Sequence, residues 1–261
     1  MIDFHTHIFP EKIAESTLAF LESKCKTKPF TNGMAEGLSQ STKEAGIDLS
    51  VILPVVTKPS QFTSINRFAL EINQENLISF GGIHPDSADY KAELNEIKRM
   101  GLKGIKLHPD YQGVFIDDIR YERIISYASE LDLIVSVHAG FDPGFPDCVH
   151  CTPLKASKML ADVKPQKLVL AHMGGFQRWD EVEEFLVGRD VYLDTAVVFG
   201  AISDEQFIRI CRMHGTDKIL FATDSPWSGQ KESVRYLNAI DLTDFEKEQI
   251  FDKNARNLLT K

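Results

Sequence analysis

Two histidines near the start of the chain have a spacing that could hold a metal ion. His5 and His7 flank one threonine in the stretch FHTHI, at the end of a short apolar run. In a strand, residues two apart project to the same face, so both imidazoles would point the same way. Neutral imidazole is a common metal ligand, and two rings on one rigid strand supply half of a four-coordinate site. A surface pair beside the N-terminus is the alternative, so further ligands must come from elsewhere in the chain.

Short apolar runs recur along the sequence and can position such residues. Eight runs are each followed by a polar or glycine-containing turn, and most then lead into a helical pattern. The runs cover residues 1–5, 49–56, 77–83, 102–108, 131–138, 167–172, 191–196 and 218–224. Helical patterns, several with apolar residues three and four apart, cover residues 11–24, 62–73, 120–131, 153–163 and 205–214.

This alternation of strand and helix predicts the fold class. Eight repeats within residues 1–224 are typical of a closed (β/α)₈ TIM barrel of parallel strands. No proline-, glycine- or serine-rich linker divides the sequence, so residues 1–261 are expected to form a single domain. An open doubly wound sheet is the alternative. It would more often carry a glycine-rich loop after the first strand, whereas HTHIFPEK contains no glycine.

The histidines fall where a barrel would place its active residues. In a parallel barrel these residues lie at the C-terminal ends of the strands. Seven of the eight histidines occupy such ends or the loops just beyond, and the last run ends in an aspartate. His214 lies in a helical pattern and is expected to be an incidental surface or helix-end residue. The candidate residues are His5, His7, His84, His108, His138, His150, His172 and Asp224.

Strand alternation adds a lysine to this set. If Ile105 and Leu107 face the helices, then Lys106 and His108 turn into the barrel. A buried ammonium without a partner loses solvation or its proton, so an inward lysine indicates a function. A Lys106 that reaches the barrel mouth and is simply solvated is the alternative.

Composition excludes several classes of partner. The net charge is −9 and the pI is about 5.4, so the chain lacks an obvious source of attraction to nucleic acid or anionic membranes. No signal-peptide pattern and no apolar run of membrane-spanning length occur, which favours a cytoplasmic protein. Cys148 and Cys151 have the spacing of a metal knuckle, but a knuckle normally needs a second pair, and Cys25 and Cys211 are isolated.

The motifs taken together resemble a known group of enzymes. FHTHI, VSVHAG, LAHMGG, TDSPW and NARNLL occur in this order over essentially the whole chain. They resemble the metal-dependent amidohydrolase superfamily, in the branch that includes aminocarboxymuconate-semialdehyde decarboxylase and various lactone hydrolases. GGIHPD also resembles TatD-type deoxyribonucleases, but those carry a metal-binding glutamate near the fourth strand, where this chain has GIKLHPD.

The resemblance implies roles for the strand-end residues. It implies that His5, His7, His138 and Asp224 ligate one divalent metal ion, most often Zn²⁺ with Mn²⁺ as the alternative, and that His172 is catalytic. In binuclear relatives a carboxylated lysine at the end of the fourth strand bridges two metals. Lys106 lies close to that place, so a second metal held with His138 and His172 is the alternative to a single ion.

The leading hypothesis is a hydrolase of an amide, lactone or ester bond in a small carboxylated molecule. A metal-activated water would attack, Asp224 would move the proton, and His172 would stabilise charge on the carbonyl. Lys106, His108 and His84 would bind the substrate carboxylate, with structural roles open for both histidines. The loop at residues 140–151 would be a lid carrying His150, or a plain surface loop. A metal-dependent decarboxylase of an unsaturated or aromatic acid and a non-catalytic metal-binding protein are the alternatives, and homo-oligomer formation is left open.

Overall fold

Short parallel strands form the inner wall of the molecule. The structure, a computed structural model, describes residues 1–73 and 76–260. The strands are β1 (Ile2–Thr6), β2 (Leu49–Ile52), β3 (Leu77–Ser79), β4 (Gly81–Gly82), β5 (Gly104–Leu107), β6 (Ile134–Val137), β7 (Leu168–Leu170), β8 (Tyr192–Asp194) and β9 (Ile219–Leu220). Each falls in one of the eight predicted runs, except that β1 extends one residue beyond its run to Thr6. The run at residues 77–83 is divided into β3 and β4 by Phe80.

The strands follow one another around a ring. β1, β2 and β3 pair in parallel in one sheet, and β4 to β9 pair in parallel in a second. Backbone bonds join β1 to the segment that directly follows β9: Phe4 N donates to Phe221 O at 2.9 Å, and Asp224 N donates to His5 O at 2.8 Å. The predicted fold class, a TIM barrel of parallel strands, is confirmed.

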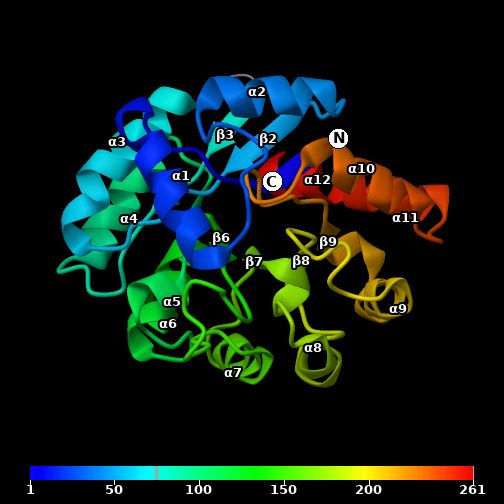
Figure 1. Cartoon of the computed structure of the whole chain (residues 1–261). Coiled ribbons are helices and arrows are strands. Elements are labelled where there is room, and N and C mark those ends of the chain that lie inside the picture. The colour runs from blue at the N-terminus through cyan, green and yellow to red at the C-terminus, as the bar shows by residue number, and fades with distance from the viewer. Residues whose placement is uncertain (74–75, 261) are drawn as a thin grey trace.

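Helices cover the outside of this ring (Figure 1). They are α1 (Glu11–Cys25), α2 (Ala35–Glu44), α3 (Phe62–Ile72), α4 (Tyr90–Arg99), α5 (Pro109–Gln112), α6 (Ile119–Glu130), α7 (Pro153–Val163), α8 (Trp179–Phe185), α9 (Asp204–His214), α10 (Gln230–Ala239), α11 (Asp244–Glu248) and α12 (Asn254–Thr260). Several begin at a polar residue that caps the first turn, as Thr152 does for Lys155 N in α7. Among the described residues, no helix combines the length and apolar character that crossing a membrane requires.

Strand alternation separates two apolar layers. Ile105, Leu107, Val135 and Val137 pack in the large cluster between the strands and the surrounding helices, as the sequence pattern predicts. A second cluster lies inside the ring and includes inward residues of most strands together with α12. Its buried members are Ile2, Phe4, Val51, Leu53, Phe80, Ile134, Val169, Ala196, Leu220, Ala222, Ala255, Leu258 and Leu259. The N-terminal part of the barrel is therefore filled with apolar side chains, which leaves the polar residues at the C-terminal ends.

An irregularity in β1 directs the two histidines inward. The register of β1 against β2 shifts between Asp3 and Thr6. Phe4 packs in the inner cluster, yet the neighbouring His5 also faces the interior, which regular alternation would not allow. A bulge of this kind re-aims side chains next to active sites. Here it brings His5 and His7 to the same face as the other strand-end residues.

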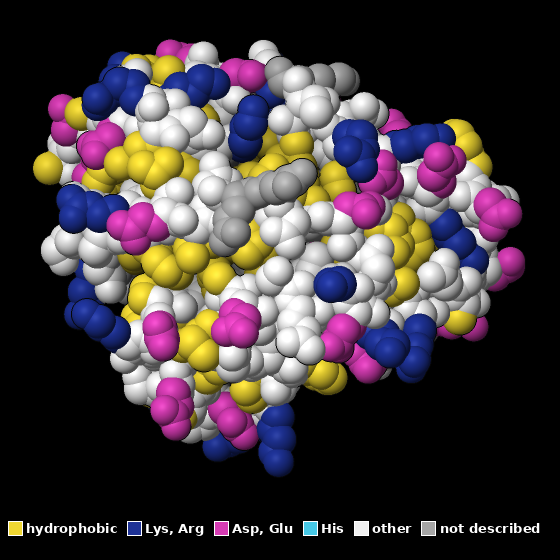
Figure 2. Space-filling model, turned by 90° about the horizontal axis from the view of Figure 1, so that it is seen from above, with side chains coloured by type: hydrophobic (Ala, Val, Ile, Leu, Met, Phe, Trp, Pro, Cys, Tyr) yellow, Lys and Arg dark blue, Asp and Glu magenta, His cyan; other side chains and the backbone are white. Residues whose placement is uncertain are grey.

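Charged side chains of both signs lie on the surface. On the face shown in Figure 2, lysine and arginine side chains alternate with acidic ones, and no histidine is visible. The N- and C-terminal parts of the chain lie close together in Figure 1, and the N-terminal ammonium lies 3.3 Å from Asp252 Oδ1.

Candidate metal centre

Three predicted ligands converge at the C-terminal end of the barrel. His7 Nε2 lies 2.9 Å from Asp224 Oδ1, and His5 Nε2 lies 3.3 Å from the same oxygen. The two Nε2 atoms are 3.1 Å apart. His5 is almost fully buried, and His7 and Asp224 are partly exposed toward the barrel mouth.

The far side of each ring fixes which nitrogen carries the proton. His7 Nδ1 lies 2.8 Å from Leu53 O, and a carbonyl can only accept, so Nδ1 is the donor. His5 Nδ1 lies 2.9 Å from Asp194 Oδ2, so it donates to that carboxylate. Both Nε2 atoms of the neutral rings then present lone pairs to each other and to Asp224. Three electron-pair donors facing one point without a proton between them fit a divalent cation.

The charge state of this group suits metal binding. Burial, with the nearby charge of Lys106, lowers the pKa of His5 well below its ordinary value, so the ring is neutral. Burial alone would raise the pKa of Asp224, but the neighbouring His5 and His7 lower it overall, so the carboxylate stays ionised. Neutral imidazoles and an ionised carboxylate are the forms that bind metals.

Lys106 points into the same space. Its side chain is fully buried, and Nζ lies 3.1 Å from His5 Nε2. Burial lowers the pKa of Lys106 to about 8, although Asp194 and Asp224 oppose this shift. The inward orientation predicted from strand alternation is therefore observed, and the alternative of a solvated lysine at the mouth is not.

His138 and His172 form a separate pair. His172 Nδ1 lies 2.9 Å from Ala196 O and donates to it, and His172 Nε2 lies 3.1 Å from His138 Nδ1. His138, which the resemblance implies as a ligand of the first metal, does not join His5, His7 and Asp224. Its donor atom instead groups with His108 and Asp142, and the rings of His138 and His108 stack at 4.1 Å.

The comparisons with known proteins fit this geometry. The family model described as Amidohydrolase matches residues 2–261. The chain belongs to the amidohydrolase family. Among curated proteins, none matches this amidohydrolase in sequence.

Solved structures share the fold of this amidohydrolase at low sequence identity. One is an uncharacterised TIM-barrel protein from Bordetella bronchiseptica (18% identity, 99% of this chain and 98% of that chain, TM-score 0.81). A dihydroxybenzoic acid decarboxylase from Polaromonas sp. JS666 with bound manganese and the inhibitor 2-nitroresorcinol is also similar (16% identity, 99% of this chain and 96% of that chain, TM-score 0.73). A 5-carboxyvanillate decarboxylase from Sphingomonas paucimobilis is similar as well (15% identity, 99% of this chain and 98% of that chain, TM-score 0.68). At these identities the likeness concerns the fold.

The three remaining candidate histidines lie outside the group formed by His5, His7 and Asp224. His150 Nδ1 lies 2.8 Å from Asp110 Oδ1, and its backbone N donates to the same oxygen at 3.0 Å. His84 Nδ1 accepts from Asp86 N at 3.1 Å, and burial lowers the pKa of His84. Neither belongs to a group of metal-ligating side chains among the described residues, whereas His108 does.

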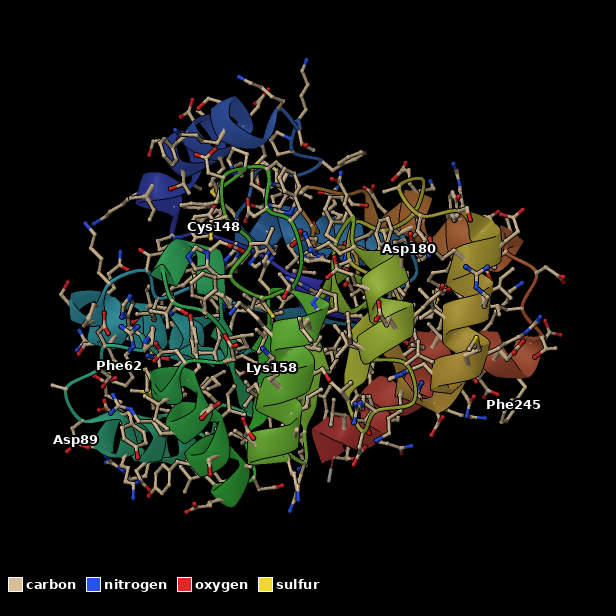
Figure 3. The ribbon with its side chains drawn as sticks, turned by 90° about the horizontal axis from the view of Figure 1, so that it is seen from below. Phe62, Asp89, Cys148, Lys158, Asp180 and Phe245 are labelled. Carbon is tan, nitrogen blue, oxygen red and sulfur yellow. The ribbon has the colours of Figure 1, made fainter. Side chains whose placement is uncertain are left out.

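His214 and the pair of Cys148 and Cys151 lie outside the candidate site. His214 ends α9, is buried, and donates from Nε2 to Val191 O at 2.8 Å. The thiols of Cys148 and Cys151 are free, and neither cysteine belongs to a metal-ligating group in the described part of the chain. Figure 3 shows Cys148 on the loop between β6 and α7.

Sequence reasoning missed Asp194, the last residue of β8. Its carboxylate is fully buried, and it accepts from His5 Nδ1, from His172 N at 2.9 Å and from Ala196 N at 3.0 Å. Asp194 therefore holds the tautomer of one candidate ligand and the backbone of the candidate catalytic histidine. An acidic residue near the end of the seventh apolar run was the signal that could have identified it.

Both predicted catalytic residues have strained backbones. His172 has a φ of 59° and Asp224 a φ of 64°. Both values lie in the left-handed region, which residues other than glycine rarely adopt. Val197, next to the carbonyl that accepts from His172, has a φ of 50°. Residues held in such conformations cluster at active sites, where the surrounding structure imposes them.

Proposed function

We propose that this amidohydrolase is a metal-dependent hydrolase that cleaves an amide, lactone or ester bond in a small carboxylated molecule. The observation that carries the proposal is the convergence of His5 Nε2, His7 Nε2 and Asp224 Oδ1 within 3.3 Å of one another. These three residues would hold one divalent ion, Zn²⁺ or Mn²⁺, and leave positions open for water and substrate. The resemblance adds His138, whose ring would have to turn away from its observed partners to reach this ion.

The residues of the chain divide the catalytic work. When bound, the ion supplies a nucleophile at neutral pH by lowering the pKa of water from about 15.7 toward about 7. Asp224, ionised and beside the open positions, accepts the proton of the attacking water and returns it to the leaving group. His172 Nδ1 donates to Ala196 O, so Nε2 is the ring nitrogen that faces the site. It would therefore stabilise a developing oxyanion only while it carries a second proton.

Lys106 is proposed to bind the substrate carboxylate as a free ammonium. Its buried Nζ has no carboxylate partner within hydrogen-bond distance among the described residues, and His5 Nε2 would be taken by the metal. A charged substrate group would then replace that contact. We also propose His84, His108 and His150 as residues that contact the substrate, from their places at or near strand ends.

Lys106→Ala tests this role. We expect KM for carboxylated substrates to rise, with the content of the first metal site unchanged. Activity that disappears on removal of bicarbonate, with two metals per chain and one of them lost in Lys106→Ala, would instead indicate a carboxylated lysine that bridges two ions.

A metal-dependent decarboxylase of an unsaturated or aromatic acid is the second candidate. The observation that favours it is that several similar solved structures are decarboxylases of hydroxylated benzoates, one of them with bound manganese. A buried cation beside the metal would also suit a substrate carboxylate that leaves as CO₂.

One experiment separates these functions. The metal-loaded protein is incubated with lactones, N-acyl compounds, esters and unsaturated or aromatic acids, and released acid and CO₂ are both measured. A hydrolase releases acid without CO₂, a decarboxylase releases CO₂ without adding water, and a metal-binding protein that is not an enzyme does neither. His7→Ala is the control for adventitious activity, since it should lose metal and turnover together. Full activity in metal-free protein would contradict both proposals.

A further inference from the structure

Asp3 is a buried acidic residue that the proposed mechanism does not use. It lies in β1, two residues before His5, and its side chain is fully buried. Its neighbours Ile2 and Phe4 pack in the inner cluster, so Asp3 faces the helices outside the ring. No lysine, arginine or histidine side chain within the described residues forms an ion pair with it. Because a fully buried acidic side chain without a cationic partner is rare, Asp3 requires an explanation.

Four hydrogen bonds compensate for this burial. Asp3 Oδ1 accepts from Thr223 N at 3.0 Å and from His5 N at 3.3 Å. Asp3 Oδ2 accepts from Thr223 Oγ1 at 2.6 Å and from Gln230 Nε2 at 2.7 Å. Three of these donors belong to His5 or to Thr223, the residue before Asp224. The Asp3 side chain therefore joins the two segments that carry His5 and Asp224.

Thr223 extends this constraint across Asp224. Its hydroxyl donates to Asp3, and the same oxygen accepts from Ser225 N at 3.1 Å. The residues on both sides of Asp224 are thus held by one hydroxyl group and one carboxyl group. Asp224 N itself donates to His5 O at 2.8 Å, so its position is also tied to β1.

Asp224 needs such a constraint because its backbone is strained. Its φ of 64° lies in the left-handed region, which a residue with a side chain keeps only where its surroundings impose it. A change of φ would move Cβ and with it the carboxylate, whose Oδ1 lies 2.9 Å from His7 Nε2. The backbone conformation at this residue therefore determines whether the three candidate ligands converge.

The other end of the contact is the irregular step in β1. The register of β1 against β2 shifts between Asp3 and Thr6, where His5 turns into the barrel. Asp3 accepts from His5 N, so its side chain contacts the backbone at this step. One carboxyl group therefore contacts both segments that supply the candidate metal ligands.

We infer that Asp3 is a positioning residue for the candidate metal centre, which holds the backbone of His5 and Asp224 so that their donor atoms meet. None of its four hydrogen bonds involves a ligand atom, so it acts through the backbone of these residues. The inference rests on the proposed function only in requiring this metal centre, and it does not depend on the reaction catalysed there.

The test measures the metal affinity of the whole protein without reference to turnover. The protein is stripped with a chelator and titrated with Mn²⁺, and free ion is followed by electron paramagnetic resonance. The ion of the first centre is the one that His7→Ala loses. In Asp3→Asn an acceptor oxygen becomes an amide donor that faces other donors, so the Kd for this ion should rise at least about tenfold.

Two variants of Thr223 separate positioning from charge. Thr223→Val has nearly the same shape and leaves the carboxyl group of Asp3 in place, but it breaks the link to Ser225 N. We expect its Kd for Mn²⁺ to rise by about tenfold as well, whereas Thr223→Ser keeps the hydroxyl and should bind like the wild type. This pair also answers the question if Asp3→Asn fails to fold, as judged by circular dichroism.

Thr42→Val is the matched control for a loss of stability. Thr42 belongs to the same buried cluster, because its Oγ1 lies 2.8 Å from Ser50 Oγ and donates to Gln230 Oε1 at 3.3 Å. These partners place it one residue away from Asp3 in the network. We expect Thr42→Val to lower the midpoint of urea denaturation and to leave the Kd for Mn²⁺ unchanged.

Two results would overturn the inference while the metal centre stands. One is a folded Asp3→Asn variant that binds Mn²⁺ as tightly as the wild type. The other is weaker binding in Thr42→Val and Thr223→Val alike, in proportion to their lost stability, which would mean that the cluster only supports the fold. Wild-type protein that binds no Mn²⁺, or a His7→Ala variant that keeps all of it, would contradict the metal centre itself and overturn both proposals.

Discussion

At the scale of single residues, what each imidazole can bind is decided by the partner on its far side. His7 donates to a backbone carbonyl, and His5 donates to a buried carboxylate. Each partner removes one tautomer and aims the other nitrogen at the centre. The same reasoning separates His172, which has a carbonyl partner, from His138, whose Nδ1 lies against His172 Nε2.

The role of Asp194 can be tested without measuring activity. Asp194→Asn keeps the shape of the side chain but removes the charge that holds His5 Nδ1–H, so the ring loses both orientation and basicity. We expect affinity for the first metal ion to fall by about 10- to 100-fold, while the fold is retained. Competition titration with a chromophoric chelator measures this. Asp190→Asn, at an exposed carboxylate just before β8, is the control. Equal affinities in the two variants would show that Asp194 only supports the fold.

Asp224 is expected to serve both as a ligand and as the proton carrier. Asn keeps one oxygen that can touch a metal but cannot accept the proton of the attacking water. In Asp224→Asn we therefore expect kcat to fall by about 10² or more, with metal largely retained. Turnover and metal content are measured on the same preparation. A variant with near wild-type kcat would mean that another group, such as His172 or His108, moves the proton.

The candidate site could be predicted from the sequence only in part. The strand-end positions of His5, His7 and Asp224 follow from the barrel topology, and the structure brings their donor atoms together. Asp110 and Asp142 could not be predicted, because a four-residue helix and an irregular loop bring them to the strand ends. The separation of His138 from the first group depends on ring orientation, which spacing does not encode.

At the scale of elements, the apolar runs locate the strands but overstate their length. In the run at residues 49–56, only the four residues of β2 form a strand, and the remaining apolar residues lie in the loop that follows. The predicted helix at residues 153–163 matches α7, since Thr152 and Pro153 mark its start. The bulge in β1 gave no signal in the sequence, because it arises from pairing with β2.

The loop after β6 depends on one glycine. Gly140 has a φ of 91°, and a Cβ there would lie 1.9 Å from Phe176 N. Gly140→Ala should therefore lower the free energy of unfolding by more than about 3 kcal/mol, since backbone would have to move. Gly101→Ala is the control: its φ is 77° and nothing lies within 4 Å, so only the conformational cost of roughly 1–2 kcal/mol applies. Urea denaturation measures both, and equal losses would mean that Phe176 yields without cost.

At the scale of the whole molecule, the barrel separates stability from chemistry. The N-terminal part of the interior is apolar and closed by α12, whereas the C-terminal part buries charges and imidazoles that do not favour folding. Lys106 is the clearest case, because its ammonium is buried and unpaired by any carboxylate at hydrogen-bond distance in the described residues. The metal-free protein should therefore be less stable than its core would allow.

This cost gives the stability of the metal-free protein a defined pH dependence. Burial lowers the pKa of Lys106 from 10.5 to about 8, so between these values the unfolded chain binds more protons than the folded one. The Lys106 contribution to the free energy of unfolding therefore rises with pH across this window, and below pH 8 its full cost is present.

Replacing the ammonium by an apolar group of similar length should remove this dependence. We expect Lys106→Met to stabilise the metal-free protein by up to about 3 kcal/mol at pH 7, and by progressively less as the pH rises toward 10. Urea unfolding of both proteins at pH 7.0 and 9.5 measures the difference. Lys103→Met, at an exposed lysine just before β5, should show no such trend. A stabilisation that stays constant over this pH range would mean that Lys106 is not a free amine titrating near pH 8. Carboxylation of its Nζ would give that result.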